Sequence, residues 1–272
     1  MRTIDPESML EQLVGQVQQG ANYREIQPDL IRSIGRRELR ERRNLREAVK
    51  ATRSKLHQVG GAYLSGQPDY AGWVRRLQDL PTGWQDLEVK HLCLDIMRAH
   101  ASTRERLPSL DTFFNTCLAS IGPVRSILDL ACGLNPLALP WMPLVDKPVY
   151  LACDIYGDMV AFLGAFFAHL RQDGRAWSCD LSQGIPDDRV HVAFLLKAIP
   201  CLEQLDRSLP LRLMDGIHAD HLLVSFPVAS LGGHGKGMRA NYEAHFMDLI
   251  ATRLWRIERH EFPGELAFLV TK

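Results

Sequence analysis

The sequence predicts an α/β protein, with a mostly parallel sheet preceded by an extension made only of helices. Up to about residue 120, apolar residues recur at helical spacing and no strand alternation is convincing. From Arg125 onward, short apolar runs alternate with helical patterns. A chain of 272 residues is long enough for one large domain and a smaller attachment. We place the helical extension at residues 1–104 and the sheet domain at 105–272.

Capping residues and helix breakers divide the extension into helices. Asp5 is a suitable N-cap for a first helix, and Gly20 is a suitable stop. The basic helices that follow end at Gly60-Gly61, and another helix begins after Asp69 and stops at Pro81. The ranges predicted outside the basic helices are 6–19, 70–80, 85–97 and a helix that includes 112–118.

Seven strands are predicted in the sheet domain. Five of them alternate with helical patterns, notably at 159–172 and 202–217, and the last two are expected to form an antiparallel pair. Five βα units followed by a hairpin favour a doubly wound sheet. The predicted strands are 126–132, 149–154, 175–180, 190–197, 221–227, 254–262 and 265–272.

Composition limits the class of protein. The hydrophobic share of 46% and the charged share of 24% are typical of soluble globular proteins. No segment approaches the ~18 apolar residues of a membrane helix, and the first residues lack a signal peptide's apolar segment. The six cysteines are widely spaced, without zinc-binding spacing. We expect a cytoplasmic protein with reduced thiols, no metal site and no membrane partner.

The charge is unevenly distributed along the chain. The formal net charge is zero, which by itself argues against a nucleic-acid partner. Residues 24–55, however, contain eleven Lys and Arg against five Asp and Glu, an excess of six that the rest of the chain balances. Such a run is often only a solvated helix face. The asymmetry nevertheless keeps an RNA partner open.

Acidic residues stand at the ends of the first three predicted strands. Asp129 lies in the last part of the first strand, and Asp154 and Asp180 end the second and third. Each alone could be an ordinary helix N-cap. Ligands of parallel sheets bind at this edge, where an acid after the second strand pairs with ribose hydroxyls. An acid after the third strand can accept a hydrogen bond from an adenine amino group.

The loop after the first strand points to an adenosine ligand without phosphates. It contains Gly133 but neither a G-x-G-x-x-G pattern nor a Walker lysine. S-adenosylmethionine fits this description. The sequence therefore predicts a Rossmann-like class I methyltransferase fold, with a seven-stranded, mostly parallel sheet and S-adenosyl-L-homocysteine as product.

Further polar groups are expected near the same strand ends. Arg104 and Arg106 precede the first strand, and a guanidinium suits the carboxylate of the cofactor's methionine part. Lys197 ends the fourth strand. The Gly- and Ser-rich segment 225–238 follows the fifth strand, where a substrate would enter, although such a composition also suits a mobile linker.

Five blocks together resemble the aminoglycoside-resistance 16S ribosomal RNA methyltransferases, which modify N7 of a guanine in the decoding site. They span most of the chain in the family's order, and a helical RNA-binding extension precedes the methyltransferase domain there too. The blocks are KLHQVGGAY (55–63), HASTRERL (100–107), ILDLACGLNP (127–136), LLKAIPCLE (195–203) and SFPVASLGGHGKGM (225–238).

The resemblance implies three sets of residues. Arg104 would bind the methionine carboxylate, and the strand-end positions of Asp129 and Lys197, taken by themselves, place these two on the same cofactor side. The other implied cofactor contacts are Ala131, Gly133, Asp154, Ile155, Asp180 and Leu181. The implied RNA-binding residues are Arg36, Arg37, Arg40, Arg43, Lys50 and Lys55. The residues implied to position the guanine are Ser230, Lys236 and Met238.

Guanine N7 carries its own lone pair on the major-groove edge, so no general base is expected. The implied partner is 16S rRNA within the 30S subunit, and we expect a monomer.

Ala229 and His234 stand where the family commonly has basic residues. Three alternatives stay open: an enzyme of this fold acting on another position such as adenine N1, an RNA-binding protein without catalysis, and a small-molecule methyltransferase with a merely solvated basic helix.

Overall fold

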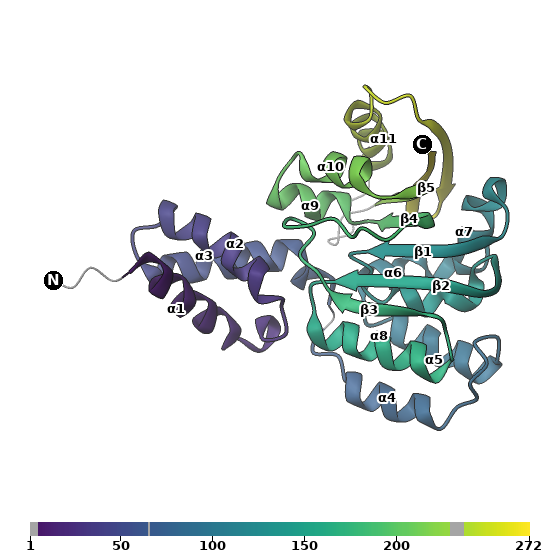
Figure 1. Cartoon of the computed structure of the whole chain (residues 1–272), viewed down its shortest axis with the longest axis horizontal. Coiled ribbons are helices and arrows are strands. Elements are labelled where there is room, and N and C mark those ends of the chain that lie inside the picture. The colour runs from purple at the N-terminus through teal and green to yellow at the C-terminus, as the bar shows by residue number, and fades with distance from the viewer. Residues whose placement is uncertain (1–4, 65, 229–236) are drawn as a thin grey trace.

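The computed structural model describes residues 5–64, 66–228 and 237–272. A lobe of three helices projects from a larger body that is built around one sheet (Figure 1). The lobe contains α1 (Pro6–Gln18), α2 (Pro28–Glu41) and α3 (Leu45–Val59), which pack against one another. Within the described ranges, none of the helices has the length and apolarity needed to cross a membrane.

One seven-stranded, mostly parallel sheet forms the body, which confirms the predicted fold class. The strands lie in the order β3-β2-β1-β4-β5-β7-β6, and β7 is antiparallel to both of its neighbours. The last two strands are the predicted antiparallel pair. The strands are β1 (Val124–Leu130), β2 (Leu144–Asp154), β3 (Gly174–Ser178), β4 (Val190–Leu196), β5 (Ala219–Pro227), β6 (Arg256–Phe262) and β7 (Glu265–Thr271).

Helices cover both faces of the sheet. On one face, α5 (Leu87–Met97), α7 (Leu110–Cys117) and α8 (Gly157–His169) bury apolar side chains against residues such as Ile127. On the other, α9 (Ile199–Leu205), α10 (Leu209–Gly216) and α11 (Met238–Leu249) pack against residues such as Leu128. Neighbouring strand residues enter different cores because strand side chains alternate between faces. A strand buried on both faces, such as β4, is therefore apolar apart from His191.

Capping residues set several of the helix boundaries. Asp5 caps α1 through the backbone N–H of Ser8, and Asn44 caps α3 through that of Glu47. The helix expected after Asp69 is α4 (Tyr70–Gln78). Because α4 packs on α8, and α5 packs on the 3-10 helix η5 (Asn135–Trp141), both helices contact the body. The domain division at 104/105 stays a prediction.

Three predicted connections are wrong. β1 is followed by η5 in place of an α-helix, since Pro140 inside the segment lacks the backbone donor that an α-helix would need there. Residues 179–189, which join β3 to β4 and are all described, contain no helix. The single helix predicted at 202–217 is two, α9 and α10. Asp206 has extended backbone, and Pro210 lies in the first turn of the second helix.

Candidate functional site

A cavity lies beyond the carboxyl ends of β1 to β4, next to the point between β1 and β4 where the strand order reverses. α3 and α6 (Ala101–Arg106) close it, with Gly60 at the end of α3 and with Ser102. Most of the predicted cofactor residues line it. These are Ala131, Asp154, Ile155, Asp180, Leu181 and Lys197.

The backbone beside the cavity is left-handed at three positions. φ is 50° at Ala131, 52° at Gly133 and 58° at Lys197. Such values are uncommon outside glycine and concentrate at functional sites. A Cβ at Gly133 would lie 2.7 Å from Cε1 of His100. Both conformation and close packing therefore require the one glycine of this loop.

Asp154 joins the loop after β1 to the end of β2. Its Oδ2 accepts a hydrogen bond from the backbone N–H of Gly133 at 2.9 Å, and its Oδ1 accepts one from that of Ile155 at 2.7 Å. Burial raises the pKa of Asp154. The backbone N–H of Tyr156 also stabilises this carboxylate, which has about four lone-pair sites, so about one acceptor position remains for a ribose hydroxyl.

Asp180 brings an unsatisfied acceptor to the cavity. Its Oδ1 accepts the backbone N–H of Ser182 at 2.9 Å, whereas Oδ2 is buried without a partner in the described residues. The hydroxyl of Tyr156 and Nδ1 of His100 are also buried without a partner there. Buried polar atoms are rarely left unpaired, so a ligand is expected to complete them. Asp154 and these atoms fit the ribose and adenine of S-adenosylmethionine.

Asp129 stands at the predicted strand end but is not among the described residues that line the cavity. Its Oδ2 accepts hydrogen bonds from Nδ2 of Asn135 and from the hydroxyl of Tyr150, each at 2.8 Å. Burial raises the pKa of Asp129 to about 7. The carboxylate holds the start of η5, and its predicted contact with the cofactor stays a prediction.

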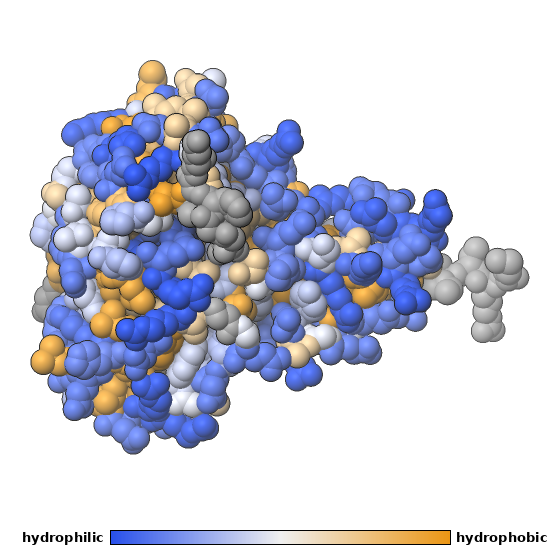
Figure 2. Space-filling model, turned by 180° about the vertical axis from the view of Figure 1, so that it is seen from behind, coloured by the Kyte–Doolittle hydropathy of each residue, from blue (hydrophilic) through white to orange (hydrophobic). Residues whose placement is uncertain are grey.

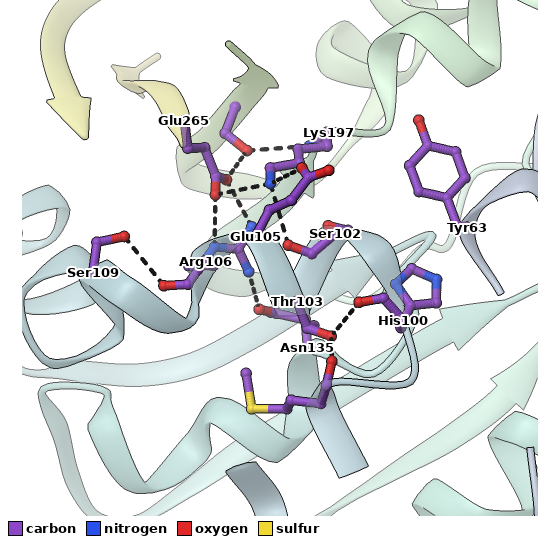
Figure 3. A network of polar contacts seen from close by, with 12 residues as sticks. Tyr63, His100, Ser102, Thr103, Glu105, Arg106, Ser109, Asn135, Lys197 and Glu265 are labelled. Carbon is purple, nitrogen blue, oxygen red and sulfur yellow. Dashed lines mark hydrogen bonds and ion pairs between the residues drawn. The ribbon is translucent and has the colours of Figure 1, made fainter. Parts of the chain in front are cut away.

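A buried ion pair lies beside the cavity (Figure 3). Nε and Nη2 of Arg106 donate to the two carboxylate oxygens of Glu265 at 3.0 and 2.7 Å, and both side chains are 0% exposed. Nη1 of Arg106 donates to Oδ1 of Asn135 at 2.6 Å. Burial opposes ionisation of Glu265, but Arg106 and Lys197 keep its pKa below the ordinary value.

Lys197 connects the ion pair to the cavity. Its ammonium lies 2.8 Å from Oε2 of Glu105 and 3.5 Å from Oε2 of Glu265, and it donates to the carbonyl of Ser102 at 3.2 Å. Figure 3 shows these groups converging from α6 and from the ends of β4 and β7. Lys197 thereby fixes the end of β4 against α6. Its contact with the cofactor stays a prediction.

The two arginines of α6 have different surroundings. Arg106 is engaged by Glu265 and Asn135 and is therefore not available to a ligand. Arg104 is exposed, donates to the carbonyl of Arg98 at 3.4 Å, and is not among the described residues lining the cavity. Its binding of the methionine carboxylate stays a prediction.

Two aromatic groups of the cavity were not identified from the sequence. The rings of Tyr63 and His100 stack with their centroids 5.9 Å apart, and the Tyr63 hydroxyl accepts a hydrogen bond from Sγ of Cys201 at 3.2 Å. Burial lowers the pKa of His100 to about 4, so the ring is neutral at pH 7. Both lie in blocks that carry the family resemblance, but nothing in those blocks marks them as cavity residues.

The predicted RNA-binding residues lie on the projecting lobe, whose surface is largely hydrophilic in Figure 2. Arg36, Arg37 and Arg40 are exposed on α2 and line one groove with Gln183, a residue of the loop after β3. Arg43 and Lys50 are exposed and Lys55 is half-buried. The groove adjoins the cavity because Gln183 also lines a cleft that contains Asp180.

Two of the three predicted guanine-positioning residues lie in a part of the chain that the structure does not describe. Ser230 and Lys236 lie outside the described residues, as do the departures Ala229 and His234. Met238 is half-buried at the first position of α11. Its role toward the substrate stays a prediction.

The fold and the cavity define a class I S-adenosylmethionine-dependent methyltransferase. The model of the FmrO ribosomal RNA methyltransferases matches residues 19–269, and the chain belongs to this family. A 16S rRNA (guanine(1405)-N(7))-methyltransferase of Micromonospora echinospora is 35% identical over 100% of both chains. A relative of the same name from Serratia marcescens is 31% identical over 92% of this chain and 93% of its own.

Solved structures agree with this assignment. The crystal structure of the 16S rRNA methyltransferase RmtF with S-adenosyl-L-homocysteine has a TM-score of 0.82 and 29% identity, over 99% of this chain and 100% of that chain. The 16S rRNA methylase RmtB has a TM-score of 0.79 and 25% identity, over 97% and 98%. The similarity thus includes the helical lobe as well as the sheet.

Removing one partner of the buried ion pair should destabilise the protein. We expect Arg106→Ala to lower the free energy of unfolding by about 3–5 kcal/mol, because Glu265 is left buried and unpaired. Arg98→Ala, which removes an exposed pair with Asp95, should change it by less than about 1 kcal/mol. Urea unfolding followed by circular dichroism measures both. Equal effects of the two variants would contradict the importance of the buried pair.

Loss of the cavity carboxylates should weaken cofactor binding. We expect Asp180→Ala to weaken S-adenosyl-L-homocysteine binding about tenfold or more, since a charged acceptor is lost. Asp154→Ala should abolish binding, because it also releases the loop at Gly133. Asp187→Ala, at a side chain that is 97% exposed, is the control. Isothermal titration calorimetry measures the affinities, and unchanged binding in Asp180→Ala would refute the assignment.

Proposed function

We propose that this protein transfers the methyl group of S-adenosylmethionine to N7 of guanine 1405 in 16S rRNA of the 30S subunit and thereby confers resistance to aminoglycosides. The observation that carries the proposal is the full-length similarity to enzymes of that name. One of them is 35% identical over 100% of both chains. We further propose that the enzyme is cytoplasmic and acts as a monomer.

The described residues support this chemistry without a general base. Bound S-adenosylmethionine supplies an electrophilic methyl group, and guanine N7 presents a lone pair that needs no deprotonation. The protein has to orient both partners and exclude water. Asp154 and Asp180 hold the adenosine side, and the neutral ring of His100 adds no positive charge to the cavity.

The arrangement of charge supports an RNA substrate. Arg36, Arg37 and Arg40 line the groove on α2 that adjoins the cavity through Gln183. Phosphates bound along this groove would hold the RNA backbone while a base enters the cavity. Arg37 is also fixed to the body, since its Nη1 donates to the carbonyl of Leu205 at 3.2 Å. The lobe would therefore orient the RNA relative to the cavity and also contribute to the binding affinity for RNA.

The remaining contacts in this proposal come from the segment 225–238 and from residues near the cavity. Ser230, Lys236 and Met238 would position the guanine, Arg104 would bind the methionine carboxylate, and Lys197 would lie beside the methyl donor. Ala229 and His234 replace basic residues in the same segment, so fewer phosphate contacts are proposed there. Cleavage at the modified nucleotide distinguishes guanine N7 from a neighbouring position such as adenine N1.

Methyl transfer to ribosomal particles tests the proposed reaction. With labelled S-adenosylmethionine, we expect incorporation into 30S subunits and little into small molecules. Borohydride and aniline treatment cleaves RNA at N7-methylguanine, so primer extension should stop immediately 3′ of guanine 1405. Asp154→Ala, which is expected to lose the cofactor, is the inactive control. Absence of label in 30S subunits would refute the proposal, and label without cleavage would move the modification to another atom.

Reversing the charge of the α2 groove should weaken subunit binding. We expect Arg36→Glu, Arg37→Glu and Arg40→Glu together to reduce 30S affinity more than tenfold and to flatten its salt dependence. The matched control reverses Arg125, Arg189 and Arg256, which are exposed near the amino ends of β1, β4 and β6. Filter binding over a salt series measures both. Equal losses in the two triple variants would contradict a specific RNA surface.

A further inference from the structure

Four of the six cysteines are clustered at the cavity edge of the sheet. Cys132 follows β1, Cys153 lies near the end of β2, Cys179 follows β3, and Cys201 lies in α9 after β4. Three of these thiols line the cavity, namely Cys132, Cys179 and Cys201. None of them has a role in the proposed methyl transfer, which needs no protein nucleophile.

The three cavity thiols differ in their hydrogen bonds. Cys132 is 5% exposed and donates to the carbonyl of Gly133 at 3.4 Å, and Cys201 donates to the hydroxyl of Tyr63. Burial raises the pKa of both thiols. Each therefore stays protonated, and a protonated thiol is a poor nucleophile.

Cys179 has the opposite surroundings. It is half-buried and also lines the cleft next to the cavity, so that reagents can approach it from two sides. The thiol of Cys153, which belongs to the neighbouring strand β2 and is 0% exposed, is the group that most lowers the pKa of Cys179. Burial and the charge of Asp180 oppose this lowering but do not outweigh it, so the pKa of Cys179 is lowered whereas those of Cys132 and Cys201 are raised.

A second observation shows that this wall of the cavity accepts a ligand. Asp180 follows Cys179 directly, and its buried Oδ2 has no hydrogen-bond partner in the described residues. The surroundings combine two carboxylates, Asp154 and Asp180, with apolar side chains, and the ammonium of Lys197 in the same lining is already paired with Glu105. A small uncharged molecule can enter such a site, whereas an anion is repelled.

We propose that Cys179 is a modification site for small uncharged thiol-directed electrophiles, and that its modification blocks the cofactor cavity. With an α-haloamide, the sulfur of Cys179 attacks the CH₂ carbon. A C–S bond forms, the carbon–halogen bond breaks, halide leaves with the bonding electrons, and the thiol proton passes to solvent. The added amide group then lies beside Oδ2 of Asp180. The proposal does not depend on which nucleotide the enzyme methylates.

Alkylation of the full chain with iodoacetamide, followed by peptide mass spectrometry, tests the proposal. The tryptic peptides 176–189 and 198–207 each contain one cysteine, Cys179 and Cys201, and so provide matched readouts. We expect 176–189 to be modified at least tenfold faster than 198–207, and saturating S-adenosyl-L-homocysteine to slow it at least tenfold. Relative to their rates with free cysteine, anionic iodoacetate should react more slowly than iodoacetamide.

Cofactor-product binding after alkylation gives the second readout. Alkylated wild-type protein and alkylated Cys201→Ser should each lose at least tenfold in S-adenosyl-L-homocysteine affinity, while Cys179→Ser should bind equally with and without iodoacetamide treatment. Faster labelling of 198–207, or labelling of 176–189 that is insensitive to S-adenosyl-L-homocysteine, would overturn the proposal. Labelling of the buried Cys93 and Cys117 at the same rate as Cys179 would also overturn it. These labelling measurements use wild-type protein and hold even if a variant does not fold.

Discussion

The ion pair between Arg106 and Glu265 joins parts of the chain that the cofactor cavity depends on. Arg106 belongs to α6 and also binds Asn135 at the start of η5, while Glu265 begins β7 and also accepts from Ser225 at the end of β5. Lys197 adds the end of β4. Charges this deeply buried are tolerated only when their hydrogen bonds are satisfied. The network therefore allows one relative placement of α6, η5 and three strand ends.

That placement explains how the cavity walls are held. The loop after β1 is fixed on one side by Asp154, through Gly133, and on the other by Asn135, which contacts both Asp129 and Arg106. His100 packs against Gly133 at the start of α6. The left-handed backbone at Ala131 and Lys197 is unfavourable in isolation and persists where the surroundings determine it. Ligand-contacting groups are thus supported by a second set of polar residues that do not line the cavity.

The sheet and the strand-end acids could be predicted from the sequence because their signals are local. The central strands are short apolar runs, and Asp154 and Asp180 stand at or just after the ends of the second and third strands. Asp129 shows the limit, since an acid that binds Tyr150 and one that faces a ligand look the same in sequence. Glu265 is harder still, because its partner Arg106 is 159 residues away. The helix breaks at η5 and Asp206 arise from prolines, which a helical pattern of apolar residues conceals.

The position of β7 in the sheet has a consequence for synthesis of the protein. β7 lies between β5 and β6, and its first residue supplies the carboxylate of the buried ion pair. A nascent chain that already contains Asp154, Asp180 and Lys197 still lacks the group that neutralises Arg106. Contacts this distant in sequence form late, because a long loop has to close before they are made. We therefore expect the cofactor to bind and stabilise the protein only after residue 265 has left the ribosome.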